Sequence, residues 1–435
     1  MSGPHPGRLS AVVLAAALAL TACGGDDKGD GKTHLTFWDN NASPTVTPIW
    51  QKTITDFEAA NPDIKVDYVG IPTAQVSQKY DTAIASNALP DVGAVTTAFL
   101  GNLTAQKALA PLDERLAGSP LNGKLSAPFL TLVKGATADG KLYELPLSGN
   151  VGTLWYRTDW FKDKNLKLDT WDDFYSAAGK LTDAKNNRFG FTIRGGAGSI
   201  AQMLEMVYGQ SGVAEFFDAS GKTTVNDPRN VAALERLVSL YKKATPAADV
   251  NNDYTKMVAQ FDGGTIGVMQ HNLGSSGDHK KALGGPDKVL GTTVPAAPGG
   301  GHVIVSNPVT GVGVFKSGKH QDAAWKFAEF ASGADNSSHF NSSTGQIPAN
   351  TDSAAAPWVS ENPTLANAVK VMADPSTKVV QLPYYLPEFS AVTKTEAEPL
   401  FQKVLLGSLP AKDFLDQIAT KLNDAQAKYK QRNGG

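Results

Sequence analysis

Hydrophobic and polar positions follow two different rhythms in the first part of the chain. Residues 35–38 (LTFW) form a short apolar run, and residues 63–69 (DIKVDYV) alternate polar and apolar side chains. Both patterns are typical of strands. Between them, Trp50, Ile54 and Phe57 recur at the spacing of one helix face. The pattern therefore predicts a strand, a helix and a second strand.

The same alternation continues along the next segment. A helical pattern over residues 73–87 is followed by a short buried strand that begins near residue 89 and ends near Thr97. Strands that alternate with helices in this way favour a doubly wound α/β fold with a parallel sheet.

Polar residues follow the first strand and the third. In open α/β sheets, ligands bind beyond the carboxyl ends of the strands. We therefore take the residues at these two strand ends as candidate ligand contacts, namely Asp39, Asn40, Asn41 and Thr97. For any one residue of the 39–41 turn, a plain Asx turn is an equal alternative.

The segment 140–161 (GKLYELPLSGNVGTLWYRTDWF) combines two apolar runs with a break between them. The first run stops at Pro146, residues 148–150 are turn-prone, and a second run covers 154–156. A chain of 435 residues is too long for one core, so two lobes are expected. We interpret 148–150 as a hinge between the lobes, with Asn150 facing the cleft.

Two later motifs carry charged groups. In TWDDF, Thr170 and Asp173 have the spacing of a helix capping box, which we favour over an acid/base pair. Arg194 opens a glycine-rich turn after the strand-like run 189–193. Its guanidinium can either bind oxygens of a ligand or pair with a carboxylate of its own lobe, and both interpretations stay open.

Composition excludes several classes of protein. Hydrophobic residues make up 41% and charged residues 19% of the chain, and 40 basic against 42 acidic side chains leave a net charge of −2. These values fit a soluble globular protein without a footprint for nucleic acid. No His-Glu-x-x-His, Gly-x-Ser-x-Gly or Walker motif occurs, and the seven His lack metal-ligand spacing. We expect no metal, no cofactor and no catalytic residues.

The N-terminal segment predicts the location of the protein. Residues 9–20 form an apolar run that ends in Leu-Thr-Ala-Cys23, which resembles a bacterial lipoprotein signal with Cys23 as the lipidated residue. A buried Cys in a hydrophobic helix is the alternative. We expect 1–22 to be a signal peptide and 23–33, which is polar and rich in Gly and Asp, to be a flexible tether. The lipid would hold the protein on the outer face of the cytoplasmic membrane.

Several motifs resemble a known family when they are taken in order. These motifs are NPDIKVDY, ALPDV, LAPLDERL, DGKLYELPLSGNVGTLWYRTDWF, TWDDFYSAAGKLT, FDGGTIGVM, HQDAAWKFAEFA and STGQIPAN. Together they resemble the extracellular solute-binding proteins of ABC importers, family 1, in the maltose-binding-like branch. The resemblance extends from about residue 35 to residue 429.

This resemblance implies a fold and a function. The fold would be α/β, periplasmic-binding-protein-like type II, with two lobes of parallel-rich sheets joined by three hinge crossings. We place the N-lobe at 34–147 and 308–350 and the C-lobe at 148–307 and 357–435, with 350–357 as a loosely ordered crossing. The protein would be a monomer that captures a sugar or oligosaccharide in the cleft and delivers it to the permease subunits.

The resemblance also adds site residues. The strand end after residue 269 delivers polar groups to the ligand in the family, which points to Gln270 and Asn272, whereas Leu273 stands where relatives often carry a Trp. Asn150 stands where a relative has a sugar-contacting Glu. Three aromatic residues could stack on sugar rings, with a core position as the alternative for each: Trp358, Tyr384 and Tyr385.

Two other functions remain open. One is an anchored enzyme that cleaves carbohydrates, because the carboxylate pair of a glycosidase can lie far apart in a sequence. The other is a receptor for a different solute, such as a peptide or a polyamine.

Overall fold

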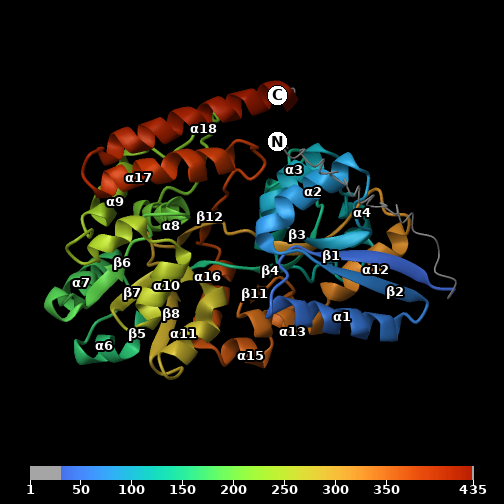
Figure 1. The fold of residues 1–435 in the computed structure, drawn as a ribbon, viewed down its shortest axis with the longest axis horizontal. Helices are drawn as coiled ribbons and strands as arrows, with labels where there is room; N and C mark the ends of the chain where they lie inside the picture. The colour runs from blue at the N-terminus through green and yellow to red at the C-terminus, as the bar shows by residue number, and fades with distance from the viewer. Residues whose placement is uncertain (1–30, 434–435) are drawn as a thin grey trace, which may run out of the picture.

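The computed structural model of the chain describes residues 31–433 and contains two large mixed sheets (Figure 1). One has six strands in the order β11-β4-β10-β3-β1-β2, the other has four in the order β6-β7-β5-β8, and β12 and β9 form a separate ladder. The strands are β1 (Thr33–Asp39), β2 (Ile64–Gly70), β3 (Val92–Thr96), β4 (Leu145–Gly149), β5 (Gly152–Arg157), β6 (Phe189–Thr192), β7 (Ile266–Asn272), β8 (Val289–Thr293), β9 (Val303–Val305), β10 (Thr310–Val314), β11 (Ile347–Pro348) and β12 (Lys378–Val380).

Strand pairing differs from the mainly parallel sheets that the sequence predicts. In the six-stranded sheet β1 pairs in parallel with β2 and β3, but β10 is antiparallel to both β3 and β4, and β11 is antiparallel to β4. In the four-stranded sheet only β6 and β7 are parallel. The expectation of parallel-rich sheets is therefore wrong. The reason is that β10 and β5 enter their sheets from the other lobe and so run against their neighbours.

The chain passes between the two sheets at three places. The first passage is shorter than expected, because Pro146, Ser148 and Gly149 are buried inside β4 and only Asn150 and Val151 separate β4 from β5. The hinge interpretation of Ser148 and Gly149, and the lobe boundary at 147/148, therefore move to residues 150–151. Proline fits here because the β4–β10 register shifts between Thr310 and Gly311, its partner, and an irregular ladder tolerates a missing N–H.

The second and third passages differ in structure. The second covers the residues between β9 and β10. The third runs from β11 through three short helices to β12, where Asn350 accepts hydrogen bonds from the backbone N–H groups of Asp352 and Ser353. The expectation of a loosely ordered segment is wrong, since the Asn350 side chain caps a helix. These helices are α14 (Thr351–Ala354), α15 (Pro357–Ser360) and α16 (Pro363–Ala373).

Helices cover both faces of the six-stranded sheet (Figure 1). In that view α2 and α3 lie on one side of β1–β3, and α1, α12 and α13 lie on the other. The helices of this lobe are α1 (Val46–Ala60), α2 (Val76–Ala85), α3 (Thr97–Ala105), α4 (Asp113–Ala117), α5 (Ala127–Gly135), α12 (Gln321–Ala331) and α13 (Ala334–Thr344).

The second lobe has helices around the four-stranded sheet and two closing helices at its top in Figure 1. They are α6 (Thr158–Asp163), α7 (Trp171–Leu181), α8 (Ser199–Ser211), α9 (Pro228–Val238), α10 (Tyr254–Asp262), α11 (Ser276–Ala282), α17 (Ala397–Leu405) and α18 (Ala411–Asn433). The predicted capping box is confirmed at the start of α7, where Thr170 and Asp173 satisfy each other's backbone N–H groups.

Each lobe has its own hydrophobic core. Buried Phe37, Trp50 and Phe327 belong to the core of the first lobe, and buried Phe174 and Phe191 belong to that of the second. Separate cores are what allow two lobes to move as units. Among residues 31–433, no helix is long and apolar enough to span a bilayer. The predicted signal peptide and Cys23 lie outside the described residues.

Candidate functional site

A cleft of about 580 Å³ lies between the two lobes. From the first lobe it is lined by the β1–α1 connection, including Asn41 and Ser43, and by the end of α13, including Gln346. From the second lobe it is lined by Tyr254 at the start of α10 and by the segment from Gly274 to Lys280. A solute held here contacts both lobes, as a ligand that closes them must.

Three amide side chains gather at the base of the cleft around Gly274. The nearest side-chain atoms to a Cβ built on Gly274 belong to Asn272, Asn150 and Gln346, at 3.4 to 3.9 Å. Asn150 Oδ1 accepts a hydrogen bond of 2.9 Å from the backbone N–H of Leu273. The first passage, the end of β7 and the far lobe therefore meet here, and the sequence-predicted Asn150 and Asn272 are brought together.

Tyr254 is the aromatic residue of the cleft. Its ring is stacked on the imidazole of His271 with centroids 4.7 Å apart, and 41% of the residue is exposed. Large hydrophobic side chains are rarely exposed: among the described residues, Leu406 is the only other one that is as open. A held but accessible ring of this kind suits stacking against the C–H face of a solute.

A smaller recess of about 160 Å³, called here the inner recess, lies on the second lobe beside the first passage. Its lining is mainly polar. The residues are Gly152, Arg194, Ala201, Gln202, Glu205, Met257, Gln270, His271, Asn272 and Asn307. The recess adjoins the cleft, because the Tyr254–His271 stack and the Asn272–Gly274 hydrogen bond of 3.0 Å connect their walls.

Glu205 is the buried acid of the inner recess. It lies in α8, is 3% exposed, and its Oε1 has no hydrogen-bond partner among the described residues. Burial raises the pKa of Glu205 to about 8, although a hydrogen bond from the backbone of Val305 lowers it in part. The neighbouring His271 is neutral, because burial and the charge of Arg194 lower its pKa to about 3.

Arg194 lies in the wall of the recess. The two interpretations of its guanidinium are contact with a ligand and pairing with a carboxylate of its own lobe. Its Nε donates to the carbonyl of Ala197 at 2.6 Å, and within the described chain it forms no ion pair. Burial lowers its pKa, and Glu398 and Asp253 act against that shift from a distance. The predicted pairing with a lobe carboxylate is thus absent among residues 31–433, and contact with a ligand remains a proposal.

The other predicted strand-end residues have different surroundings. Asp39 is buried, accepts a hydrogen bond of 2.8 Å from the Tyr68 hydroxyl, and has its pKa raised by burial. Asn40 is buried with its Nδ2 unpartnered within the described chain, whereas Asn41 reaches the cleft. Thr97 accepts a hydrogen bond of 3.1 Å from the Val309 N–H. Thr97 therefore holds the second passage.

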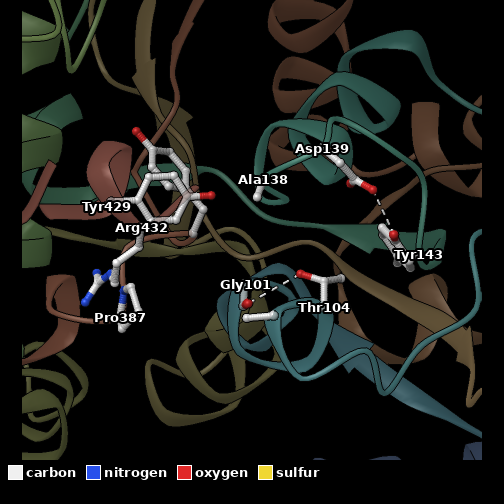
Figure 2. A pocket seen from close by; sticks show the side chains of 10 residues that line it. Gly101, Thr104, Ala138, Asp139, Tyr143, Pro387, Tyr429 and Arg432 are labelled. Carbon is white, nitrogen blue, oxygen red and sulfur yellow. Dashed lines mark hydrogen bonds between the residues drawn. The ribbon is translucent and has the colours of Figure 1, made fainter. Parts of the chain in front are cut away.

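The three aromatic residues predicted from the sequence do not join the cleft. Trp358 on α15 packs against the core of the first lobe, and Tyr384 after β12 packs against both cores. Tyr385 donates to Gln426 at 3.0 Å and lines a separate pocket of about 390 Å³ between α3 and α18. Figure 2 shows this pocket, with Thr104 on one wall and Tyr429 and Arg432 on the other.

Sequence reasoning missed several residues of the site, among them Gln346, Tyr254 and Glu205. Tyr254 gives no signal, because it stands alone after a polar turn and its exposure depends on the far lobe. Glu205 gives one: it is the only charged residue in the otherwise mainly apolar helix α8. A lone acid in a buried helix face must face a polar cavity or remain protonated.

Comparisons with known proteins place this geometry in a family. The model of the bacterial extracellular solute-binding proteins matches residues 41–337. A binding protein of Brucella abortus is 24% identical over 336 residues, covering 75% of this chain and 79% of its own. A mannitol-binding protein of Pseudomonas aeruginosa is 25% identical and covers 49% of each chain.

Solved structures agree with this match. The sugar-binding protein MalE from Xanthomonas citri superimposes with a TM-score of 0.78 at 18% identity, over 92% of this chain and 99% of its own. This likeness shows the two-lobe fold, and the family model shows the relationship. The chain belongs to the bacterial extracellular solute-binding proteins, which are receptors and not enzymes.

Proposed function

We propose that this protein is the receptor of an ABC importer for a sugar or a polyol, which it binds in the cleft and the inner recess. The observation that carries the proposal is the lining of these two spaces. Amides at the base, hydroxyls along α13 and one exposed aromatic ring match the hydroxyl and C–H faces of a carbohydrate.

Closure of the two lobes follows from where these groups stand. Asn41 and Gln346 belong to one lobe, and Tyr254 belongs to the other. A sugar that touches both sets is bound more tightly by the closed form and shifts the equilibrium toward it. The closed form is the one that delivers the sugar to the permease.

Relatives support a carbohydrate over other solutes. The Pseudomonas relative binds mannitol according to its name, and the Xanthomonas structure is named a sugar-binding protein. The recess also holds the positive charge of Arg194, which opposes a polyamine.

The test is a binding panel on the mature protein. Calorimetry and thermal unfolding are measured with maltose, lactose, mannitol and ribitol, and with a tripeptide and spermidine as non-sugar probes. We expect saturable stabilisation by at least one carbohydrate, which chromatography recovers intact. Stabilisation by the tripeptide or spermidine alone, or cleavage of a sugar, would contradict the proposal.

We also propose that the protein is a monomer held on the outer face of the cytoplasmic membrane by a lipid on Cys23. The support is the sequence 9–23 and the extracellular location of the family. Replacing Cys23 by Ser should release the protein into the medium and abolish labelling by a radioactive fatty acid. Retention of the Cys23→Ser protein on the membrane would overturn the anchor.

A further inference from the structure

The inner recess contains one polar group whose partner is missing, the carboxyl of Glu205. The other polar side chain of α8 that lines the recess, Gln202, is already engaged. Gln202 accepts from the Arg194 N–H at 2.7 Å and donates to the Gln270 carbonyl at 3.3 Å. Glu205 Oε1 has no such contact with the described residues, although it is buried and lines the recess.

Space for this carboxyl is created by a glycine. A Cβ built on Gly152 would lie 2.3 Å from Cδ and from Oε1 of Glu205. Any larger residue at the start of β5 would push the carboxyl away from the first passage. Glu205 therefore stands directly beside the hinge, at the point where a solute in the recess meets the passage.

Burial decides which form of the Glu205 carboxyl is present, since it raises the pKa of this group to about 8. The titratable or charged groups that face the recess or sense Glu205 are Arg194 before α8, His271 on β7 and Tyr384 after β12. His271 is neutral, and burial raises the pKa of Tyr384, so both are uncharged near neutral pH. Glu205 is then the one group of the recess that changes charge between about pH 7 and pH 9.

We propose that Glu205 is a specificity-determining residue that, in its protonated form, donates a hydrogen bond to an oxygen of the bound sugar or polyol. The inference rests on the proposed function. It commits to an uncharged oxygen acceptor and excludes an amine at this position. An ammonium group would meet a neutral acid and the positive charge of Arg194 in the same space.

A protonated donor makes binding depend on pH with a fixed sign. When only the protonated form of Glu205 binds, the apparent dissociation constant rises as this form is lost. With a pKa of about 8, the protonated fraction falls from about nine-tenths at pH 7 to about one-tenth at pH 9. The dissociation constant should therefore rise about tenfold over this range.

The experiment uses those of maltose, lactose, mannitol and ribitol that bind in the panel above. Their dissociation constants are measured by calorimetry at pH 7 and pH 9 for the wild type, Glu205→Gln and Glu144→Gln. Glutamine keeps a donor but does not titrate, so Glu205→Gln should bind at pH 7 within about threefold of the wild type and show no loss at pH 9.

Glu144 is a matched control, since it is fully buried and unpartnered in the other lobe. Glu144→Gln should keep the tenfold pH dependence.

Each other outcome overturns the inference separately from the proposed function. Equal affinity at both pH values in the wild type, or the same loss in Glu205→Gln, removes Glu205 from recognition while sugar binding stands. Affinity that rises with pH would show that the ionised carboxylate of Glu205 binds the sugar better than the protonated acid, which would refute the donor role. If no carbohydrate binds at either pH, the proposed function fails. Infrared difference spectra between the free wild type and free Glu205→Gln still test the protonation of Glu205. A wild type without the carboxylic-acid band of Glu205 would also refute the inference.

Discussion

Tyr254 is a single side chain on which the outer part of the site depends. Its ring is fixed by His271 and open to the cleft. Replacement of Tyr254 by Ala should weaken binding of the panel sugar about tenfold, because a stacked aromatic contributes about 1 to 2 kcal/mol at a binding site. Tyr254→Phe, which keeps the ring, should stay within about threefold.

Leu406→Ala provides the matched control for that measurement. Leu406 is 57% exposed at the end of α17 and does not line the cleft. Its replacement should leave the affinity measured by calorimetry unchanged. Equal effects of Tyr254→Ala and Leu406→Ala would remove Tyr254 from the site.

Stability should also report on Glu205. Its pKa is about 8 in the folded protein and about 4.3 in an unfolded chain, so between these values the native state binds more protons. The free energy of unfolding then falls as the pH rises through this window. Denaturant unfolding should give a smaller decrease from pH 6 to pH 9 for Glu205→Gln than for the wild type. A surface change, Glu215→Gln, should leave the decrease as it is.

At the residue scale, the sequence indicates polar positions better than their surroundings. Asn150 and Asn272, predicted from a chain break and a strand end, lie together around Gly274, and each also accepts a backbone hydrogen bond there. Thr97 and Tyr384, also predicted as ligand contacts, instead contact the second passage and the cores in this structure. Whether a side chain is exposed to solvent depends on contacts with the other lobe. The local sequence pattern contains no information about those contacts.

Among the elements, α7 shows how tightly helices and strands are fitted. A Cβ on Gly190 of β6 would lie 1.8 Å from the Ala178 carbonyl of α7, whereas a Cβ on Gly179 of the same helix meets nothing within 4 Å. Gly190→Ala should therefore lower the free energy of unfolding by about 3 kcal/mol or more. Gly179→Ala should raise it by about 0.5 to 1 kcal/mol, since alanine favours the helix.

Urea unfolding of both variants checks this pair. The two substitutions are chemically identical and only 11 positions apart, so opposite signs isolate the effect of space. Destabilisation of both to the same extent would mean that helix and strand do not approach each other as closely as described.

Local signals determine how well elements are predicted. The capping box at Thr170 is confirmed because its partners are three residues apart and need nothing else. The β4 strand is misjudged because Pro and Gly normally interrupt strands, yet here β10 and β11 pair with it and tolerate both. Long-range strand pairing overrides the local preference, and local sequence patterns contain no information about such pairing.

For the whole molecule, closure on the solute is the testable consequence. Small-angle scattering of the wild type should give a smaller radius of gyration at saturating concentrations of the panel sugar. At one subsaturating concentration, the radius of gyration of Tyr254→Ala should decrease less than that of the wild type. An unchanged radius in the saturated wild type would show that binding does not move the lobes.

The fold as a whole is predicted from the order of several weak motifs, and the family match confirms it. The relative direction of neighbouring strands is not predicted, because it depends on which strands become neighbours in the sheet. Alternating elements suggest parallel neighbours, but β10 lies between β3 and β4 after a long excursion through the second lobe.

That excursion sets the order in which the molecule can fold. About 160 residues separate β4 from β10, its neighbour in the six-stranded sheet. The first lobe thus lacks an inner strand until most of the chain has been made, and pairing over such a distance is slow. A ribosome-bound or shortened chain that ends before residue 310 cannot close this sheet. In a chain made from its N-terminus, the first lobe can therefore complete its sheet only after most of the second lobe has been made.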